Sequence, residues 1–304
     1  MKAADFVYLR AETVEEAVAH LADYGGDARI IAGGQSLMPM LNMRLWRLSA
    51  LIDVNRVPGL DALHSRGDET VAGAMVRHAT LETSPVAAER LPLLAHMIRF
   101  VGDRQVRNRG TLGGSLVQAD PTGEMPLGCL VLGARAVAHG SGGAREIAID
   151  SFYEGSYATA LEYDEMLTEI VFPKHPPHFA FTEFSRRHGD FCVLSVAAVG
   201  ERAPDGRWRG VRIGLGGVAD TPVLALEAAA LVEGTRLTDD DIAEASQAAL
   251  SATDPASDIR ASAEYRAHLV PVYVRRALQQ LRAHAQGSEH ASGNGPGTTG
   301  GRHT

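Results

Sequence analysis

The segment Ile31-Ala32-Gly33-Gly34-Gln35-Ser36-Leu37 predicts a strand that ends in a sharp, glycine-rich turn. Two adjacent glycines remove the Cβ atoms that would shield successive backbone amides, so the turn can present N–H donors to a phosphate. Gln35 and Ser36 add side-chain donors of their own. Taken alone, the segment could equally be a tight strand-to-helix turn that requires positive φ.

A second turn of the same kind is Arg107-Asn108-Arg109-Gly110-Thr111-Leu112-Gly113-Gly114-Ser115. Arg104, Arg107 and Arg109 lie upstream of its glycines and make the approach to them basic. Taken alone, it could be a solvated basic loop beside an ordinary turn. Together, the two turns could grip the two phosphates of a dinucleotide from opposite sides. The chain has neither GxGxxG nor GxxxxGK[ST], so this arrangement differs from a Rossmann unit or a P-loop.

The surrounding pattern predicts three structured units. In the first, Thr13 and Glu16 form a capping box before an amphipathic helix, between short strands at 6–8, 29–32 and 51–54 in a mostly parallel sheet. The second begins near Leu60 and includes a helix at 86–100 that is interrupted early by Pro92, a polar loop at 102–110 and a final strand ending at Pro173. After a linker at 174–178, we expect strands at 191–199 and 211–218 and helices at 224–232, 239–250 and 265–285.

Composition excludes several classes of function. The 304 residues have a formal net charge of −8, which disfavours a nucleic-acid-binding surface. No apolar run is long enough for a membrane span, and the N-terminus lacks a signal peptide's apolar segment, so a cytoplasmic protein is expected. The 2 cysteines are too few for an iron–sulfur cluster or a structural zinc site. Any redox chemistry should therefore come from an organic cofactor.

Several segments resemble the FAD-binding medium subunits of the molybdenum hydroxylase family, the carbon monoxide dehydrogenase and xanthine dehydrogenase type. The first turn continues as Met38-Pro39 with Arg44 beyond, and the second reaches Ala119-Asp120-Pro121. Ser185-Arg186-Arg187-His188-Gly189-Asp190-Phe191 and the stretch from Asp254 to Arg266 resemble the family's later motifs. The resemblance extends over residues 1–285.

The resemblance implies an α+β fold. It comprises a two-part FAD-binding domain of the PCMH (vanillyl-alcohol-oxidase-like) type, then an α/β C-terminal domain with an antiparallel sheet and helices. We expect FAD-binding subdomains at 1–58 and 59–176, a C-terminal flavoprotein domain at 177–286, and a disordered tail at 287–304, which is rich in Gly, Ser and Thr.

The resemblance also implies the cofactor contacts. The two turns would bind the diphosphate and ribityl part of FAD, while Asp120 and Glu124 would contact the sugar and ribityl portions. Gly102 would approach the ring, and Ile170 would pack on the adenine or dimethylbenzene side. Phe191 would lie over the isoalloxazine, although a Phe there could also be a core residue of a strand. The full expected set is Ala32, Gly33, Gly34, Gln35, Ser36, Leu37, Gly102, Thr111, Leu112, Gly113, Gly114, Ser115, Asp120, Glu124, Ile170 and Phe191.

One position departs from the family. Where many relatives have a Lys that contacts FAD, this chain has Ser185, which brings no charge. Arg186 or Arg187 could supply that charge, or the two could simply be solvated. His188 and Asp190 could be read as an acid–base pair, but they are better placed to shape the loop beside the ring.

The implied function is electron transfer. No side chain is expected to be catalytic, and no metal is expected on this chain. Substrate would be oxidised at a molybdenum–pterin centre on a large subunit, and electrons would pass through 2Fe-2S clusters on a small subunit to FAD here, within a dimer of heterotrimers. Two other classes stay open: a free-standing FAD-dependent oxidase and a flavin-free scaffold subunit.

Overall fold

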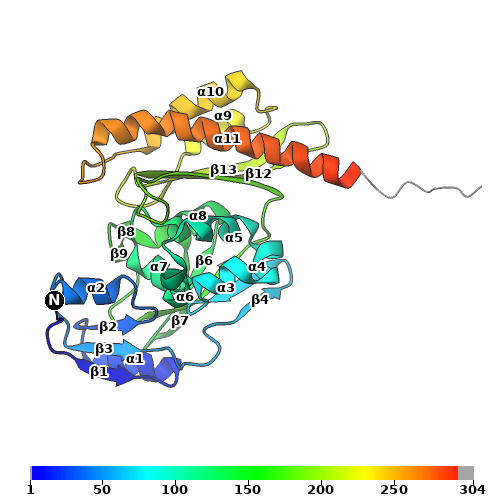
Figure 1. Cartoon of the computed structure of the whole chain (residues 1–304). Coiled ribbons are helices and arrows are strands. Elements are labelled where there is room, and N and C mark those ends of the chain that lie inside the picture. Colours follow the sequence, from blue (N-terminus) through cyan, green and yellow to red (C-terminus); the bar gives the residue numbers. More distant parts are fainter. Residues whose placement is uncertain (1, 294–304) are drawn as a thin grey trace, which may run out of the picture.

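Three large β-sheets, each with its own helices, follow one another from one end of the molecule to the other (Figure 1). The computed structural model describes the backbone of residues 2–293 and the side chains of residues 2–286. The N-terminal sheet lies at one end, and the C-terminal sheet with its long helix lies at the other. The fold is α+β, as the sequence predicted.

The N-terminal sheet has three parallel strands, which confirms the expected parallel pairing. Their order is β1 (Val7–Arg10), β3 (Ala50–Asp53), β2 (Ala28–Ile31). Helix α1 (Val14–Asp23) packs between this sheet and strands of the next, and a short helix, α2 (Leu37–Asn42), follows β2. At the start of α1, the Thr13 hydroxyl accepts a hydrogen bond from the Glu16 amide at 3.1 Å. The Glu16 carboxylate in turn accepts from the Glu12 amide at 2.7 Å, so both side chains cap the helix.

The second sheet is antiparallel and is covered by short helices. Its order is β4 (Leu63–Arg66), β5 (Glu69–Gly73), β10 (Met166–Phe172), β6 (Arg135–Gly140), β7 (Gly143–Ala148). A small ribbon, β8 (Tyr153–Gly155) with β9 (Ala158–Thr159), lies before β10. The helices of this unit are α3 (His78–Thr83), α4 (Pro85–Arg90), α5 (Pro92–Met97), α6 (Arg104–Arg109), α7 (Leu112–Gln118) and α8 (Glu124–Leu132).

One prediction in this unit was wrong. The expected polar loop at 102–110 contains helix α6, whose N-cap is Asp103, with its carboxylate accepting from the Val106 amide at 2.8 Å. This helix has no buried residue, so it has no apolar periodicity that would reveal it. The interruption expected at Pro92 is confirmed: α4 ends at Arg90, and Pro92 begins α5.

The C-terminal sheet is antiparallel, in the order β11 (His178–Phe184), β12 (Leu194–Arg202), β13 (Trp208–Gly216), β14 (Val223–Leu224). Helices α9 (Leu226–Val232), α10 (Asp239–Ala248) and α11 (Ala263–Gly293) cover one face of this sheet. Strand β12 begins three residues later than expected, so Phe191 lies in the preceding loop. The predicted tail, 287–304, begins within α11, and its residues 294–304 lie outside the described part of the chain.

The second and third units are joined by one apolar core. Every residue of α8 is buried, and the cluster around it includes Phe181, Ala197 and Val199 from the C-terminal sheet. The C-terminal sheet therefore packs directly onto α8, which fixes the loops at that sheet's edge relative to α7. In the described residues, no helix is long and apolar enough to cross a membrane.

Candidate functional site

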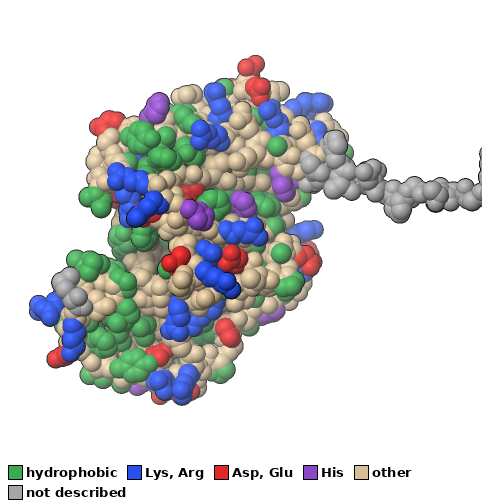
Figure 2. All heavy atoms as spheres, viewed as in Figure 1, with side chains coloured by type: hydrophobic (Ala, Val, Ile, Leu, Met, Phe, Trp, Pro, Cys, Tyr) green, Lys and Arg blue, Asp and Glu red, His purple; other side chains and the backbone are tan. Residues whose placement is uncertain are grey.

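A cavity of about 770 Å³ lies where the three units meet, in the size range of small-molecule sites. In Figure 2 the molecule is hollowed between the N-terminal lobe and the rest. Among the predicted site residues, Leu112 and Ile170 are fully buried and do not line the cavity. The others line it: Ala32, Gly33, Gly34, Gln35, Ser36, Leu37, Gly102, Thr111, Gly113, Gly114, Ser115, Asp120, Glu124 and Phe191.

The first glycine-rich turn presents free backbone donors. Gly34 adopts φ +72°, which turns the chain out of β2 into α2. Within the described part of the chain, no protein acceptor is found for the N–H groups of residues 33–37, whereas the Met38 amide already donates to the Gly34 carbonyl. Consecutive unpartnered amides that line a cavity form an anion-binding surface.

The second turn is built differently from the first. It is the first turn of α7, and its amides are already bonded: Leu112 N–H to the Val76 carbonyl and Gly113 N–H to the Ala74 carbonyl, each at 2.9 Å. The Thr111 hydroxyl accepts from the Gly114 amide at 3.0 Å. The expectation that both turns offer the same amide chemistry is therefore wrong, and the second turn faces the cavity mainly with exposed Gly114 and the Ser115 hydroxyl.

The two turns touch each other. A Cβ atom on Gly33 would overlap the carbonyl of Arg109, so only glycine allows this approach. A Cβ on Gly113 would lie 2.7 Å from the Ala74 carbonyl oxygen, which fixes α7 against the end of β5. These two glycines therefore serve close packing of backbone on backbone.

His78 is a site residue that sequence reasoning missed. Its side chain is buried, and its Nε2 lies 3.0 Å from both the Thr111 carbonyl and the Ser115 hydroxyl. Burial lowers the pKa of His78 to about 4, so the ring is neutral near pH 7. With Nε2–H directed at the Thr111 carbonyl, the Ser115 hydroxyl keeps its own proton for a ligand. A lone His in a sequence with 12 of them gives no signal of this role.

Two carboxyl groups line the cavity: Asp120, which lies between α7 and α8, and Glu124, the first residue of α8. Asp120 accepts hydrogen bonds from the Thr122 amide at 2.9 Å, the Thr122 hydroxyl at 2.7 Å and the Tyr157 hydroxyl at 3.3 Å. Burial is the main cause that raises the pKa of Glu124 to about 8, and the charge of the nearby Glu183 carboxylate adds to this shift. Burial also raises the pKa of Glu183, to about 7. Glu124 is thus mainly protonated near pH 7 and can donate a hydrogen bond.

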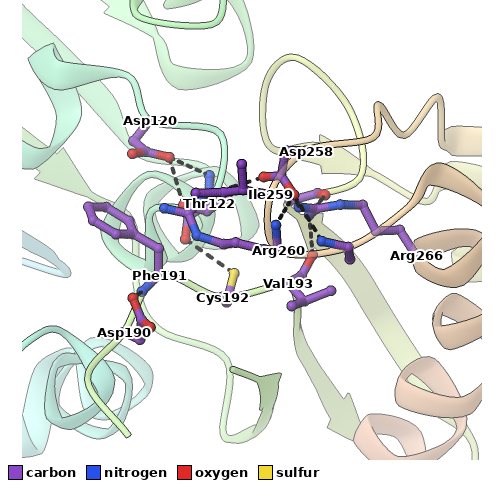
Figure 3. Close-up of polar contacts among 12 residues, drawn as sticks. Asp120, Thr122, Asp190, Phe191, Cys192, Val193, Asp258, Ile259, Arg260 and Arg266 are labelled. Atoms are coloured by element: carbon purple, nitrogen blue, oxygen red, sulfur yellow. Dashed lines mark hydrogen bonds and ion pairs between the residues drawn. The ribbon is translucent and has the colours of Figure 1, made fainter. Parts of the chain in front are cut away.

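The loop before β12 closes one side of the cavity. Phe191 is 51% exposed and lines the cavity, so it is not a core residue. Arg260 lies over its ring, and Arg260 belongs to the turn that Asp258 anchors (Figure 3). Upstream in this loop, a Cβ on Gly189 would lie 2.7 Å from the Gly102 carbonyl, which brings the loop against the predicted Gly102.

Ser185 stands where many relatives have a Lys, with Arg186 and Arg187 beside it, and none of these three residues lines the cavity. The Ser185 hydroxyl donates to the Arg187 carbonyl at 3.0 Å. Arg186 donates to the carbonyls of Ile259 at 3.2 Å and Arg260 at 2.6 Å. The side chain of Arg187 is 85% exposed and pairs with Asp190 at 3.5 Å. The two arginines therefore shape loops and surface.

The two cysteines, Cys129 and Cys192, are free and buried, and burial raises the pKa of both thiols. The Cys192 thiol donates to the Thr122 carbonyl at 3.4 Å. They behave as small core residues.

Comparison with known proteins follows the division seen in the fold. Residues 4–175 match the FAD binding domain in molybdopterin dehydrogenase, and residues 179–281 match the CO dehydrogenase flavoprotein C-terminal domain. The chain is 39% identical to the 6-hydroxypseudooxynicotine dehydrogenase complex subunit alpha of Paenarthrobacter nicotinovorans, over 91% of this chain and 95% of that subunit. It is 38% identical to the nicotine 6-hydroxylase medium subunit of the same organism, over 93% and 99% of the two chains.

Solved structures give the same relationship. A chain of the carbon monoxide dehydrogenase from Hydrogenophaga pseudoflava superposes with a TM-score of 0.91 at 36% identity, covering 93% of this chain and 99% of that one. A chain of quinoline 2-oxidoreductase from Pseudomonas putida 86 superposes with a TM-score of 0.89 at 36% identity, covering 95% and 99%. The chain therefore belongs to the FAD-binding medium subunits of the molybdenum hydroxylases, the flavoprotein components of these heteromeric oxidoreductases.

Proposed function

We propose that this chain binds FAD in the 770 Å³ cavity and transfers electrons from an iron–sulfur partner subunit to an external acceptor. The observation that carries the proposal is the run of unpartnered amides at residues 33–37, placed against the second turn at the cavity wall. The flavin, when bound, supplies the redox chemistry.

The residues present fit a dinucleotide. We assign the diphosphate to the amides of the first turn, with Ser115 and exposed Gly114 opposite, and the sugar and ribityl hydroxyls to Asp120 and protonated Glu124. Gly102 packs against Gly189 in the loop that carries Phe191, and both Gly102 and Phe191 line the cavity and would flank the ring. Leu112 and Ile170 would support the site from the core, because neither side chain reaches the cavity.

The protein's own contribution would be binding and positioning. Asp190 accepts a hydrogen bond from its neighbour, the Phe191 amide, at 2.9 Å, which shapes the loop. His78 directs the Ser115 hydroxyl. No residue of this site needs to transfer a proton to substrate, because substrate oxidation would occur on the large molybdenum–pterin subunit.

We further propose that the chain assembles with that large subunit and a small 2Fe-2S subunit as a dimer of heterotrimers. Relatives are named as the nicotine 6-hydroxylase medium subunit and the carbon monoxide dehydrogenase medium chain, and the word medium implies a larger and a smaller partner. In this assembly 1–58 and 59–176 would form the two FAD-binding subdomains, and 177–286 the C-terminal flavoprotein domain.

Co-expression with the subunits encoded by neighbouring genes tests the proposal. The expected product is a complex that contains FAD, molybdenum and iron, with FAD lost in Gly33→Ala because the new Cβ displaces the Arg109 carbonyl. Gly142→Ala is the matched control, since a Cβ there meets no atom within 4 Å. A chain that binds no FAD would indicate a scaffold, and a lone chain that oxidises substrate would indicate a free-standing oxidase.

A further inference from the structure

A side-chain bridge links the two glycine-rich turns behind the cavity. On one side, Asn55 follows β3, and its Nδ2 donates to the Ala32 carbonyl at 2.9 Å. The Asp53 carboxylate fixes this side chain, accepting from Asn55 Nδ2 at 2.6 Å and from the Asn55 amide at 2.8 Å. Asp53 also accepts a hydrogen bond from the Tyr8 hydroxyl. The carbonyl at the start of the first turn is therefore tied to the sheet.

On the other side, Arg77 reaches the second turn directly and the first turn through Asn55. Its backbone lies between residues that pair with the second turn: the His78 amide donates to the Gly110 carbonyl at 3.0 Å, and the Leu112 amide donates to the Val76 carbonyl at 2.9 Å. The guanidinium donates through Nη1 to the Arg109 carbonyl and through Nη2 to Asn55 Oδ1 at 2.6 Å.

The bridge depends on the shape of the guanidinium as well as on its charge. Arg77 forms no ion pair with any residue in the described part of the chain, and burial together with nearby Arg109 lowers its pKa. Its position is set by two neutral acceptors that belong to different segments. A planar guanidinium can donate to both at once from fixed directions, whereas a Lys ammonium is a single point.

We propose that Asn55 and Arg77 are positioning residues that set the spacing of the two turns, and with it the affinity for the diphosphate of the cofactor. The proposal rests on the proposed function. Because Gly33 has no Cβ atom, the first turn can approach the Arg109 carbonyl of the second. The bridge through Asn55 and Arg77 holds that same carbonyl in place.

The test is the dissociation constant of FAD for the deflavinated full chain, together with its melting temperature before FAD is added. Arg77→Gln and Asn55→Ala should each weaken FAD binding by about tenfold or more, the usual effect of losing a hydrogen bond to a charged group. Arg77→Lys should weaken FAD binding as much as Arg77→Gln does. The double variant should bind FAD little more weakly than either single variant, because the two substitutions break the same bridge. Arg90→Gln removes a guanidinium that donates to the Gly67 carbonyl at 3.2 Å, away from the cavity lining, and should bind FAD like the wild type.

Several outcomes would overturn the proposal. Wild-type affinity in Arg77→Lys would show that charge alone matters, and additive losses in the double variant would show two independent effects. A lowered melting temperature with unchanged FAD affinity would show a purely structural role. If Arg77→Gln fails to fold, Asn55→Ala tests the bridge from its other end. A wild-type chain without FAD affinity would instead refute the proposed function itself.

Discussion

The guanidinium carbon of Arg260 lies 5.0 Å from the centroid of the Phe191 ring, within the range of a cation–π contact. Phe191 lines the cavity from a loop, and Arg260 comes from the turn before α11, so the contact joins two segments distant in sequence (Figure 3). It restrains an aromatic ring that is itself 51% exposed.

Replacing Arg260 with Ala should loosen the Phe191 ring. Because an exposed cation–π contact contributes about 0.5–1 kcal/mol, we expect FAD to dissociate about two- to fivefold faster. Iodide should also quench the flavin fluorescence more strongly. Stopped-flow release of FAD and a quenching titration measure these effects.

Arg276→Ala is the matched control, since Arg276 lies 4.7 Å from the Tyr273 ring centroid on α11. Tyr273 does not line the cavity, so this variant should lose a similar contact without changing FAD release. Equal release rates in Arg260→Ala and the wild type would refute a role for this contact.

The turn that carries Arg260 depends on a partly buried ion pair. Arg266 is 3% exposed, pairs with Asp258 at 2.8 Å and donates to the carbonyls of Val193 and Gly217. Burial alone would raise the pKa of Asp258, but the amides of Ala261 and Arg260 and the Arg266 guanidinium outweigh it and lower that pKa to about 2. The carboxylate therefore stays charged under all ordinary conditions.

Asp258→Asn should destabilise the chain by about 2 kcal/mol, because it leaves the buried Arg266 cation without its counter-charge. Urea unfolding at neutral pH measures the change. The exposed pair of Arg282 with Asp239 at 2.8 Å serves for comparison, and Asp239→Asn should cost less than about 1 kcal/mol. Similar losses in the two variants would contradict the importance assigned to Asp258.

The cysteines give a chemical test of burial. Cys129 and Cys192 have no exposed surface, and burial raises the pKa of each thiol, so neither forms the reactive thiolate in the folded chain. We expect no reaction with a thiol reagent in native buffer and reaction of both cysteines in concentrated urea. A thiol that reacts rapidly in the native chain would show that its surroundings open.

Much of the fold could be predicted because its signals are local. The cap at Thr13 and the glycine-rich turn after β2 are each contained in a short stretch of sequence. Helix α6 was missed because none of its residues is buried, although Asp103 was a usable N-cap signal.

The site was predictable only in outline. Most residues that the resemblance named line the cavity, but Leu112 and Ile170 do not, and His78 was missed. The amides of Leu112 and Gly113 are occupied because they donate to the carbonyls of Val76 and Ala74. The bridge from Asn55 to Arg77 joins the segment after β3 to the residue before α3. Such contacts between distant segments leave no local pattern in one sequence. The same is true of Arg260, which no spacing rule would have placed on Phe191.

Glu124 predicts an unusual pH dependence of stability. Its pKa rises from the model-compound value of 4.5 to about 8 on folding, so between these values the folded chain binds more protons than the unfolded chain. The free energy of unfolding contributed by this group is therefore present in full below 4.5 and is lost as pH rises toward 8. From about pH 6 to about pH 8, the slope should approach about −1 kcal/mol per pH unit.

Glu124→Gln should remove most of this slope, because a neutral amide of the same shape does not ionise. Urea unfolding of the FAD-free chain at several pH values measures it, and Glu154→Gln, at an exposed position of β8, should leave the slope unchanged. Glu183 also has a raised pKa, of about 7, so a weaker decline should persist in Glu124→Gln and disappear only when both are replaced. A stability that rises over this range in the wild type, or a slope unaffected by Glu124→Gln, would show that Glu124 is ionised at the cavity wall and cannot donate the hydrogen bond assigned to it.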